Sequence, residues 1–174
     1  MSIRHGHEVG DGRARDLAET GCVARIRALE RVADQPTPVF GVVAVGGRRF
    51  ILEGLDDTAS TPYLTGLVTM VEEEAGPADA VTTELADRVR AEHAAYLSLL
   101  GAEPVALPGE AGEVAYAVGL SMALEPADGQ QVLDARTSRA QLRIVLALLR
   151  RERSLVGRFG AVPGVASPGG SSLN

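Results

Sequence analysis

The 174-residue sequence contains no lysine, no tryptophan and only one cysteine, Cys22. All 17 basic residues are arginines. An arginine side chain keeps its charge, so it cannot act as a neutral base or an amine nucleophile. A phosphate-binding loop of the Gly-Lys-Ser/Thr type is equally excluded, because its lysine is missing. We therefore assign no catalytic residue and expect no cofactor.

Aromatic residues make up 3% of the chain, whereas 45% is hydrophobic, so the core must be built from Ala, Val, Leu and Ile. The net charge of −6 gives little support for DNA binding, which draws on a broad positive surface. A lone cysteine cannot form an internal disulfide, which favours a reducing cytoplasm. The N-terminus lacks an apolar signal-peptide region, and the longest apolar run, Ile144 to Leu149, is too short to cross a membrane.

The first part of the chain shows the period-two alternation of β-strands. Between residues 22 and 32, apolar Ala24 and Ile26 alternate with Arg25 and Arg27, which predicts a half-buried strand. Further strands are predicted over 39–45, 48–55 and 63–71. Because Gly-Gly suits the positive φ angles of a two-residue turn, we expect a hairpin at Gly46-Gly47.

The second part shows helical spacing of apolar residues. Helices are predicted over 79–100, 110–124, 130–133 and from Thr137 or Ser138 to about residue 157, and we expect Pro126 to end the second of them. Strands followed by helices indicate an α+β fold. The expected organisation is a β-rich half over 1–75, a helical half of the same domain over 76–159 and a disordered Gly/Ser/Pro-rich tail over 160–174.

Four motifs in this order resemble the N-terminal substrate-binding domain of the Lon proteases, from about Ile3 to Leu155. They are Gly21-Cys22-Val23-Ala24-Arg25-Ile26, Gly47-Arg48-Arg49-Phe50, Pro62-Tyr63-Leu64 and the segment from Asp134 to Arg143 before an apolar run. The resemblance implies a PUA-like small β-barrel followed by a helical subdomain. Family members have a Pro- and Phe-rich strand region before the point matched by Ile3, so the barrel is expected to be incomplete. A late start codon or a truncated paralogue would each explain this.

The resemblance implies a non-catalytic protein-binding module of protein quality control. Its expected partners are unfolded or damaged polypeptides, or a protease component, and not DNA. Without lysine, neither the ATPase nor the serine–lysine peptidase site of Lon can be present in this sequence. A PUA-like RNA-binding module is the alternative, although low basicity and few aromatic residues disfavour it. A decayed domain without binding is a third interpretation.

The candidate partner-binding residues belong to the second and third motifs: Arg48, Arg49, Phe50, Tyr63 and Leu64. The competing interpretation is structural. Alternation would leave one of the two arginines in solvent and let the other pair with Glu53 or Asp56. The two aromatic rings would then pack in the core.

Three further groups of residues carry side chains that can bind a metal, titrate or act as a nucleophile. His5 and His7 have the spacing of a strand metal site, but no other Cys/His cluster supports one, so we assign no metal. His93 is expected to be solvated or paired along its helix with a residue such as Glu92. Cys22 is expected to be a small buried hydrophobe and not a nucleophile.

We predict that the purified protein hydrolyses neither ATP nor peptides, because the sequence offers no lysine for either reaction. ATP turnover and casein cleavage should stay at the level of a buffer control. Either activity, if it co-purified with this chain through several chromatographic steps, would contradict the prediction.

Overall fold

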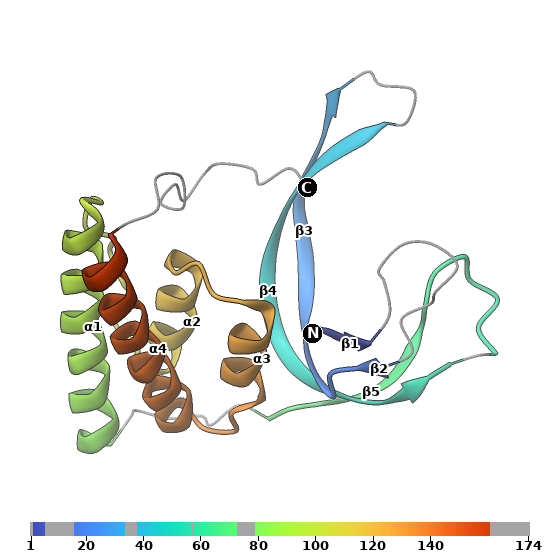
Figure 1. The fold of residues 1–174 in the computed structure, drawn as a ribbon. Coiled ribbons are helices and arrows are strands. Elements are labelled where there is room, and N and C mark those ends of the chain that lie inside the picture. The colour runs from blue at the N-terminus through green and yellow to red at the C-terminus, as the bar shows by residue number, and fades with distance from the viewer. Residues whose placement is uncertain (1, 6–15, 34–37, 57, 73–78, 161–174) are drawn as a thin grey trace. The chain divides into compact units, whose positions relative to one another are not determined.

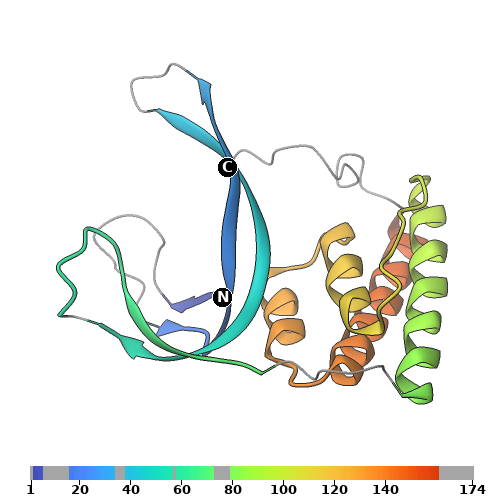
Figure 2. The same ribbon diagram turned by 180° about the vertical axis from the view of Figure 1, so that it is seen from behind.

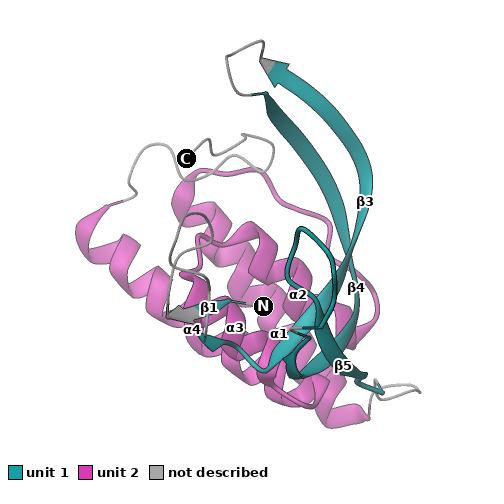
Figure 3. Cartoon of the chain, turned by 90° about the vertical axis from the view of Figure 1, so that its right-hand side faces the viewer, with its two compact units in different colours: residues 1–73 teal, residues 74–174 magenta. Residues whose placement is uncertain are grey.

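A computed structural model describes residues 2–5, 16–33, 38–56, 58–72 and 79–160. The chain divides into two compact units, residues 1–73 and 74–174, called here the β unit and the helical unit (Figure 3). Strands precede helices along the chain, which confirms the α+β class. The predicted boundary at residue 75 and the predicted tail from 161 onward lie outside the described residues.

The β unit is dominated by one long antiparallel pair (Figures 1 and 2). Strand β3 (Thr20–Ala33) pairs with β4 (Val39–Leu55) from Thr20↔Ile51 to Ala33↔Val39. Strand β5 (Gly66–Met70) lies on the other side of β4, with Phe50↔Met70 and Leu55↔Gly66 as its end pairs. The short strands β1 (Ile3–His5) and β2 (Asp16–Leu17) form a separate two-stranded sheet.

The predicted turn at Gly46-Gly47 is wrong, because both glycines lie inside the continuous strand β4. A two-residue hairpin turn of this kind needs positive φ angles. Among the described residues only Gly101 and Gly160 have them. In the β3–β4 register, Cys22 pairs with Arg49 and Ala24 with Gly46. Two residues of β4 therefore oppose one residue of β3, which is a β-bulge, the other common reason for glycine within a strand.

The predicted half-buried strand over 22–32 is also wrong, because the β3 side chains from residue 24 to residue 32 are all exposed. A second bulge, at Arg27, lies between the pairs Ile26↔Ala44 and Ala28↔Val43. A one-residue insertion moves every later side chain to the opposite face. Ala28 consequently leaves the face of Ile26, and Leu29 joins that face instead.

The helical unit contains four helices with recognisable ends. Helix α1 (Ala80–Leu100) begins after Asp79, whose side chain accepts a hydrogen bond from the Thr82 backbone N–H at 2.7 Å, and ends at Gly101 in the left-handed conformation. Helix α4 (Ser138–Phe159) is capped by Thr137, whose hydroxyl oxygen accepts from the Ala140 backbone N–H at 3.2 Å. These two predicted helix starts are confirmed.

The two central helices differ from the prediction around Pro126. Helix α2 (Ala111–Ser121) ends before this proline, and α3 (Pro126–Asp134) begins with it. Proline is favoured in the first turn of a helix, because its missing N–H would have no partner there. Pro126 was therefore correctly predicted to lie at a helix boundary. It follows the end of α2 and is also the first residue of α3.

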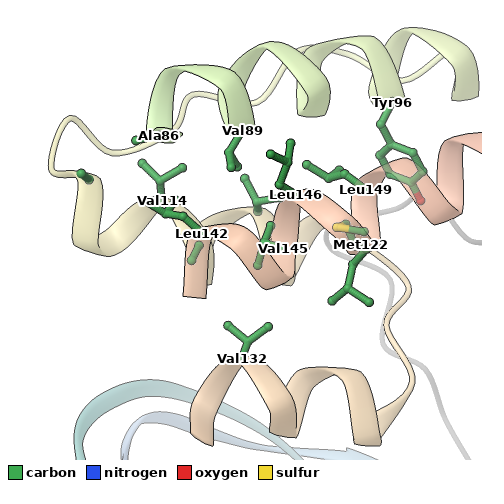
Figure 4. Close-up of a cluster of buried hydrophobic side chains, with 14 of the residues drawn as sticks. Ala86, Val89, Tyr96, Val114, Met122, Val132, Leu142, Val145, Leu146 and Leu149 are labelled. Atoms are coloured by element: carbon green, nitrogen blue, oxygen red, sulfur yellow. The ribbon is translucent and has the colours of Figure 1, made fainter. Parts of the chain in front are cut away.

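The aliphatic core lies within the helical unit, between α1, α2 and α4, with Val132 of α3 at its side (Figure 4). Its fully buried side chains alternate in size, which allows close packing of the helices. They are Ala86, Val89, Val114, Ala115, Val118, Leu142, Val145 and Leu149. In the β unit the buried hydrophobic side chain among the described residues is that of Ala18.

We predict that Leu149→Ala lowers the free energy of unfolding of the helical unit by about 2 to 5 kcal/mol, because Leu149 is fully buried and its truncation leaves a cavity. Leu120→Ala is the matched control, since Leu120 lies in the same unit but is 88% exposed. Its effect should stay within about 0.5 kcal/mol. Urea unfolding followed by the helical circular dichroism signal measures both. Equal destabilisation by the two substitutions would contradict this account of the core.

Candidate binding surface

The five candidate residues do not form one site. Arg48, Arg49 and Phe50 lie on β4 at the Met70 end of the β4–β5 ladder. Tyr63 and Leu64 precede β5, beyond the opposite end of that ladder, where Leu55 pairs with Gly66. The five residue steps from Phe50 to Leu55 span roughly 16 Å of strand. The structure therefore separates the two motifs along the sheet.

The two adjacent arginines have opposite environments. Arg48 is exposed, whereas Arg49 is only 4% exposed, as expected for neighbours on a strand. The Arg49 carbonyl oxygen accepts a hydrogen bond from the Val71 backbone N–H at 2.9 Å, the last such bond between β4 and the β5 segment. Arg48 is therefore the member of the pair that is free to meet a partner.

Phe50 has a structural role at the base of the β3–β4 pair. It pairs across the ladder with Gly21, and a Cβ atom added to Gly21 would lie 2.3 Å from Phe50 Cζ. The ring thus lies directly over the glycine, which only a residue without a side chain permits. On the other side, Phe50 pairs with Met70. Phe50 is half-buried and already has packing partners within the β unit.

Tyr63 and Leu64 are exposed to solvent in the segment that precedes β5. They are 68% and 52% exposed. The loop is closed where the Asp56 backbone N–H donates to the Thr65 carbonyl oxygen at 2.8 Å. The Asp56 carboxylate accepts hydrogen bonds from the Thr58 backbone N–H at 3.0 Å and from the Thr58 hydroxyl at 2.6 Å, and these bonds lower the Asp56 pKa.

Sequence reasoning missed an exposed apolar surface of the β unit. We call residues 23–33 of β3 and 39–48 of β4 the arm, which β5 does not reach (Figure 1). Directly paired residues share a face. One face, called the apolar arm face, carries exposed Ile26, Leu29, Phe40, Val42 and Ala44, with Arg31 opposite Phe40 at one end. The run Val39 to Val45 was the available signal; it was predicted to be a strand, without a prediction that its side chains are exposed.

Cys22 and His93 differ from their expected environments. Cys22 is a free thiol of intermediate exposure and is not buried. His93 is 2% exposed in the core and is not solvated. Its Nε2 lies 2.6 Å from Ser121 Oγ, and the Ser121 hydroxyl donates to the Val118 carbonyl oxygen at 2.8 Å. The Ser121 hydroxyl has one proton, which it donates to Val118. His93 Nε2 must therefore be the donor in its hydrogen bond to Ser121.

The proposed His5–His7 pair falls partly outside the described residues, since His7 is not described and only the backbone of His5 is. His5 lies in β1 opposite Asp16. Within the described ranges, no group of three or more His, Cys, Asp or Glu side chains is arranged to hold a metal ion.

A shallow groove of about 270 Å³ lies between α1 and α4, lined by Arg88, Ala91, Glu92, Ala95, Arg150 and Arg153. Glu92 accepts a hydrogen bond from Arg153 Nη1 and lies 3.6 Å from Arg150 Nε, so this carboxylate of α1 holds two arginines of α4. Such surface ion pairs join the two helices, and we assign no ligand to the groove.

Residues 4–151 match the family model described as the ATP-dependent protease La (LON) substrate-binding domain. The chain belongs to this family. The match includes strands of the β unit and helices of the helical unit, so both units are parts of the family domain. No curated protein matched the chain closely enough to count as a relative.

Membership confirms the resemblance drawn from the four motifs. The Lon substrate-binding domain is a non-catalytic, protein-binding module, and this is the level at which the function of the chain is established. Among the described residues, no helix is both long enough and apolar enough to span a membrane.

We predict that acidification destabilises the helical unit through His93. Burial lowers the pKa of His93 below its ordinary value of 6.5. Between these two values the unfolded chain binds the proton more readily than the folded chain, so stability falls as the pH falls through this window. Chemical unfolding at pH 7.5 and at pH 5.5, compared between the wild type and His93→Gln, measures the effect.

His93→Gln removes the titrating group while every other ionisable group stays the same in both proteins. The stability lost between the two pH values should therefore be smaller in the variant. Equal losses in the two proteins would show that His93 does not titrate as its buried position requires.

Proposed function

We propose that this domain binds unfolded or damaged polypeptide segments through the apolar arm face of the β unit. One observation carries the proposal: Ile26, Leu29, Phe40 and Val42 are 65%, 59%, 50% and 54% exposed on a single face. Soluble proteins seldom leave a contiguous apolar patch uncovered unless it serves an interaction.

The physical properties of the arm support this role. A two-stranded β-hairpin is marginally stable by itself in water, so covering one face also stabilises the hairpin. Each large apolar side chain that a ligand covers contributes on the order of 1–2 kcal/mol. Apolar contact has little directional requirement, so many unrelated sequences can satisfy it. This tolerance suits a receptor for protein quality control.

Tyr63 and Leu64 form a second exposed apolar position, on the loop before β5. We propose that they extend the surface available to a long polypeptide, while Arg48 contributes charge at the end of the arm. Arg49 and Phe50 hold the base of the arm, so their replacement should act on folding before it acts on binding. A reducing cytoplasm remains our proposal for the compartment, because it suits the lone free thiol of Cys22.

The observation that favours RNA binding instead is the charge of the arm, which carries Arg25, Arg27, Arg31 and Arg48 against Glu30. Phosphate contacts of arginine give strongly salt-dependent affinity. Apolar contacts weaken little with salt, so the two functions differ in a measurable way.

The test is Leu29→Ser, which places a polar group on the apolar arm face. We predict that this variant binds a permanently unfolded model protein about 5- to 30-fold more weakly than the wild type, which corresponds to about 1–2 kcal/mol for one covered side chain. Leu120→Ser is the matched control, because Leu120 is equally apolar and 88% exposed but lies in the helical unit. Its affinity should equal that of the wild type.

A structured RNA is titrated in parallel at low and moderate salt. The proposal requires that the unfolded protein binds at both salt concentrations and that Leu29→Ser, but not Leu120→Ser, weakens this binding. Tight RNA binding that falls steeply with salt, without affinity for the unfolded protein, would replace the proposal with an RNA-binding function.

A further inference from the structure

The two strands of the arm leave one backbone edge of β4 open. Strand β5 pairs with β4 from Phe50 to Leu55, and the Val71–Arg49 hydrogen bond ends this contact. From Val39 to Arg48, no described strand pairs with β4 on the side that β5 occupies further along. Backbone N–H and C=O groups on such an edge can pair with an added strand.

The two outer edges of the arm differ in how well they are protected. Strand β3 is interrupted by bulges at Arg27 and Val32 and carries charged side chains at four positions, Arg25, Arg27, Glu30 and Arg31. Bulges and edge charges are the devices by which proteins prevent unwanted strand pairing. Strand β4 has no charged residue from Val39 to Gly47 and no inserted residue between Val39 and Gly46.

Positive charge is concentrated at one end of the open β4 edge. A Cβ atom placed on Gly47 would lie 3.9 Å from Arg25 Nη2, so the Arg25 guanidinium extends from β3 onto β4 beside this glycine. The next residue, Arg48, is exposed. This end of the edge is therefore complementary to acidic groups of a partner.

We propose that the open β4 edge, Val39 to Arg48, accepts an extended peptide as an added strand. The preferred peptide has an apolar stretch and acidic residues beside Arg25 and Arg48. This inference rests on the proposed polypeptide-binding function and names the class of segment selected. Backbone hydrogen bonds would provide general affinity, and the arginines would provide the preference for acidic residues.

The direction of the peptide follows from β5. An antiparallel strand that continues the line of β5 would begin beside Arg48 and end beside Val39. The acidic residues would then occupy the amino end of the peptide, and its apolar residues would alternate toward Phe40 and Val42 on the apolar arm face. The edge is about 30 Å long, so about ten residues fill it.

The first experiment measures how three ten-residue peptides bind the full chain at low ionic strength. They share one alternating apolar stretch and differ at two amino-terminal residues, which are glutamate, glutamine or lysine. We expect the glutamate peptide to bind about fivefold more tightly than the lysine peptide, since exposed ion pairs contribute modestly. The difference should shrink at high salt.

Charge reversal provides the matched comparison. The double variant Arg25→Glu/Arg48→Glu should reverse the preference, so that the lysine peptide binds more tightly. Arg143→Glu is the control, because Arg143 is an exposed arginine of α4 in the helical unit. This control should keep the preference for glutamate.

The second experiment tests strand addition itself. Two versions of the glutamate peptide carry backbone N-methyl groups at either the odd-numbered or the even-numbered residues of the stretch. In an added strand, alternate N–H groups point toward β4 and toward solvent. One version should therefore lose more than about tenfold in affinity, and the other should bind nearly as well as the unmethylated peptide.

Equal affinity for the glutamate and lysine peptides, or an equal response to the two methylation patterns, would overturn this inference. If Leu29→Ser still weakened binding of the unfolded protein, the proposed function would survive that outcome. If neither the peptides nor the unfolded protein bound, both proposals would be wrong.

Discussion

The burial of aliphatic side chains between α1, α2 and α4 is the interaction on which the structure depends. Valine and leucine fill this core without a single tryptophan or phenylalanine among its buried members. The helical unit can therefore satisfy its hydrophobic residues internally. The β unit has no comparable core among its described residues, and its apolar side chains face solvent. The exposed apolar side chains of the arm therefore favour the binding of a partner, because covering apolar surface is favourable for both molecules.

The irregularities of β3 and β4 determine which surface is offered. Without the bulge at Arg27, Leu29 would lie on the face opposite Ile26, and the apolar arm face would be broken. The Arg25 guanidinium of β3 also lies beside β4, within ordinary contact distance of a Cβ atom placed on Gly47. Small backbone insertions thus gather apolar residues on one face and positive charge at one end of the arm.

Membership of the Lon substrate-binding domain family gives these features a context. The family domain binds protein and carries no catalytic site. Of the residues that the motifs indicated, Arg49 is buried and Phe50 is half-buried, whereas Arg48, Tyr63 and Leu64 are exposed at two separate places. Motif residues that identify a family need not all contact its ligand, since some of them preserve the fold that presents the contacting residues.

The sequence by itself determined the order of strands and helices, the family, the caps of α1 and α4 and the aliphatic nature of the core. These features depend on local rules: capping chemistry, apolar periodicity and glycine at a left-handed helix end. Only the tertiary structure decided that Gly46-Gly47 is part of a bulged strand, that His93 is buried against Ser121 and that the run from Val39 to Val45 is uncovered. Each of these depends on which residues lie opposite one another across distant parts of the chain. A pattern of apolar residues predicts that a face needs covering, but it cannot show whether the same chain supplies the cover.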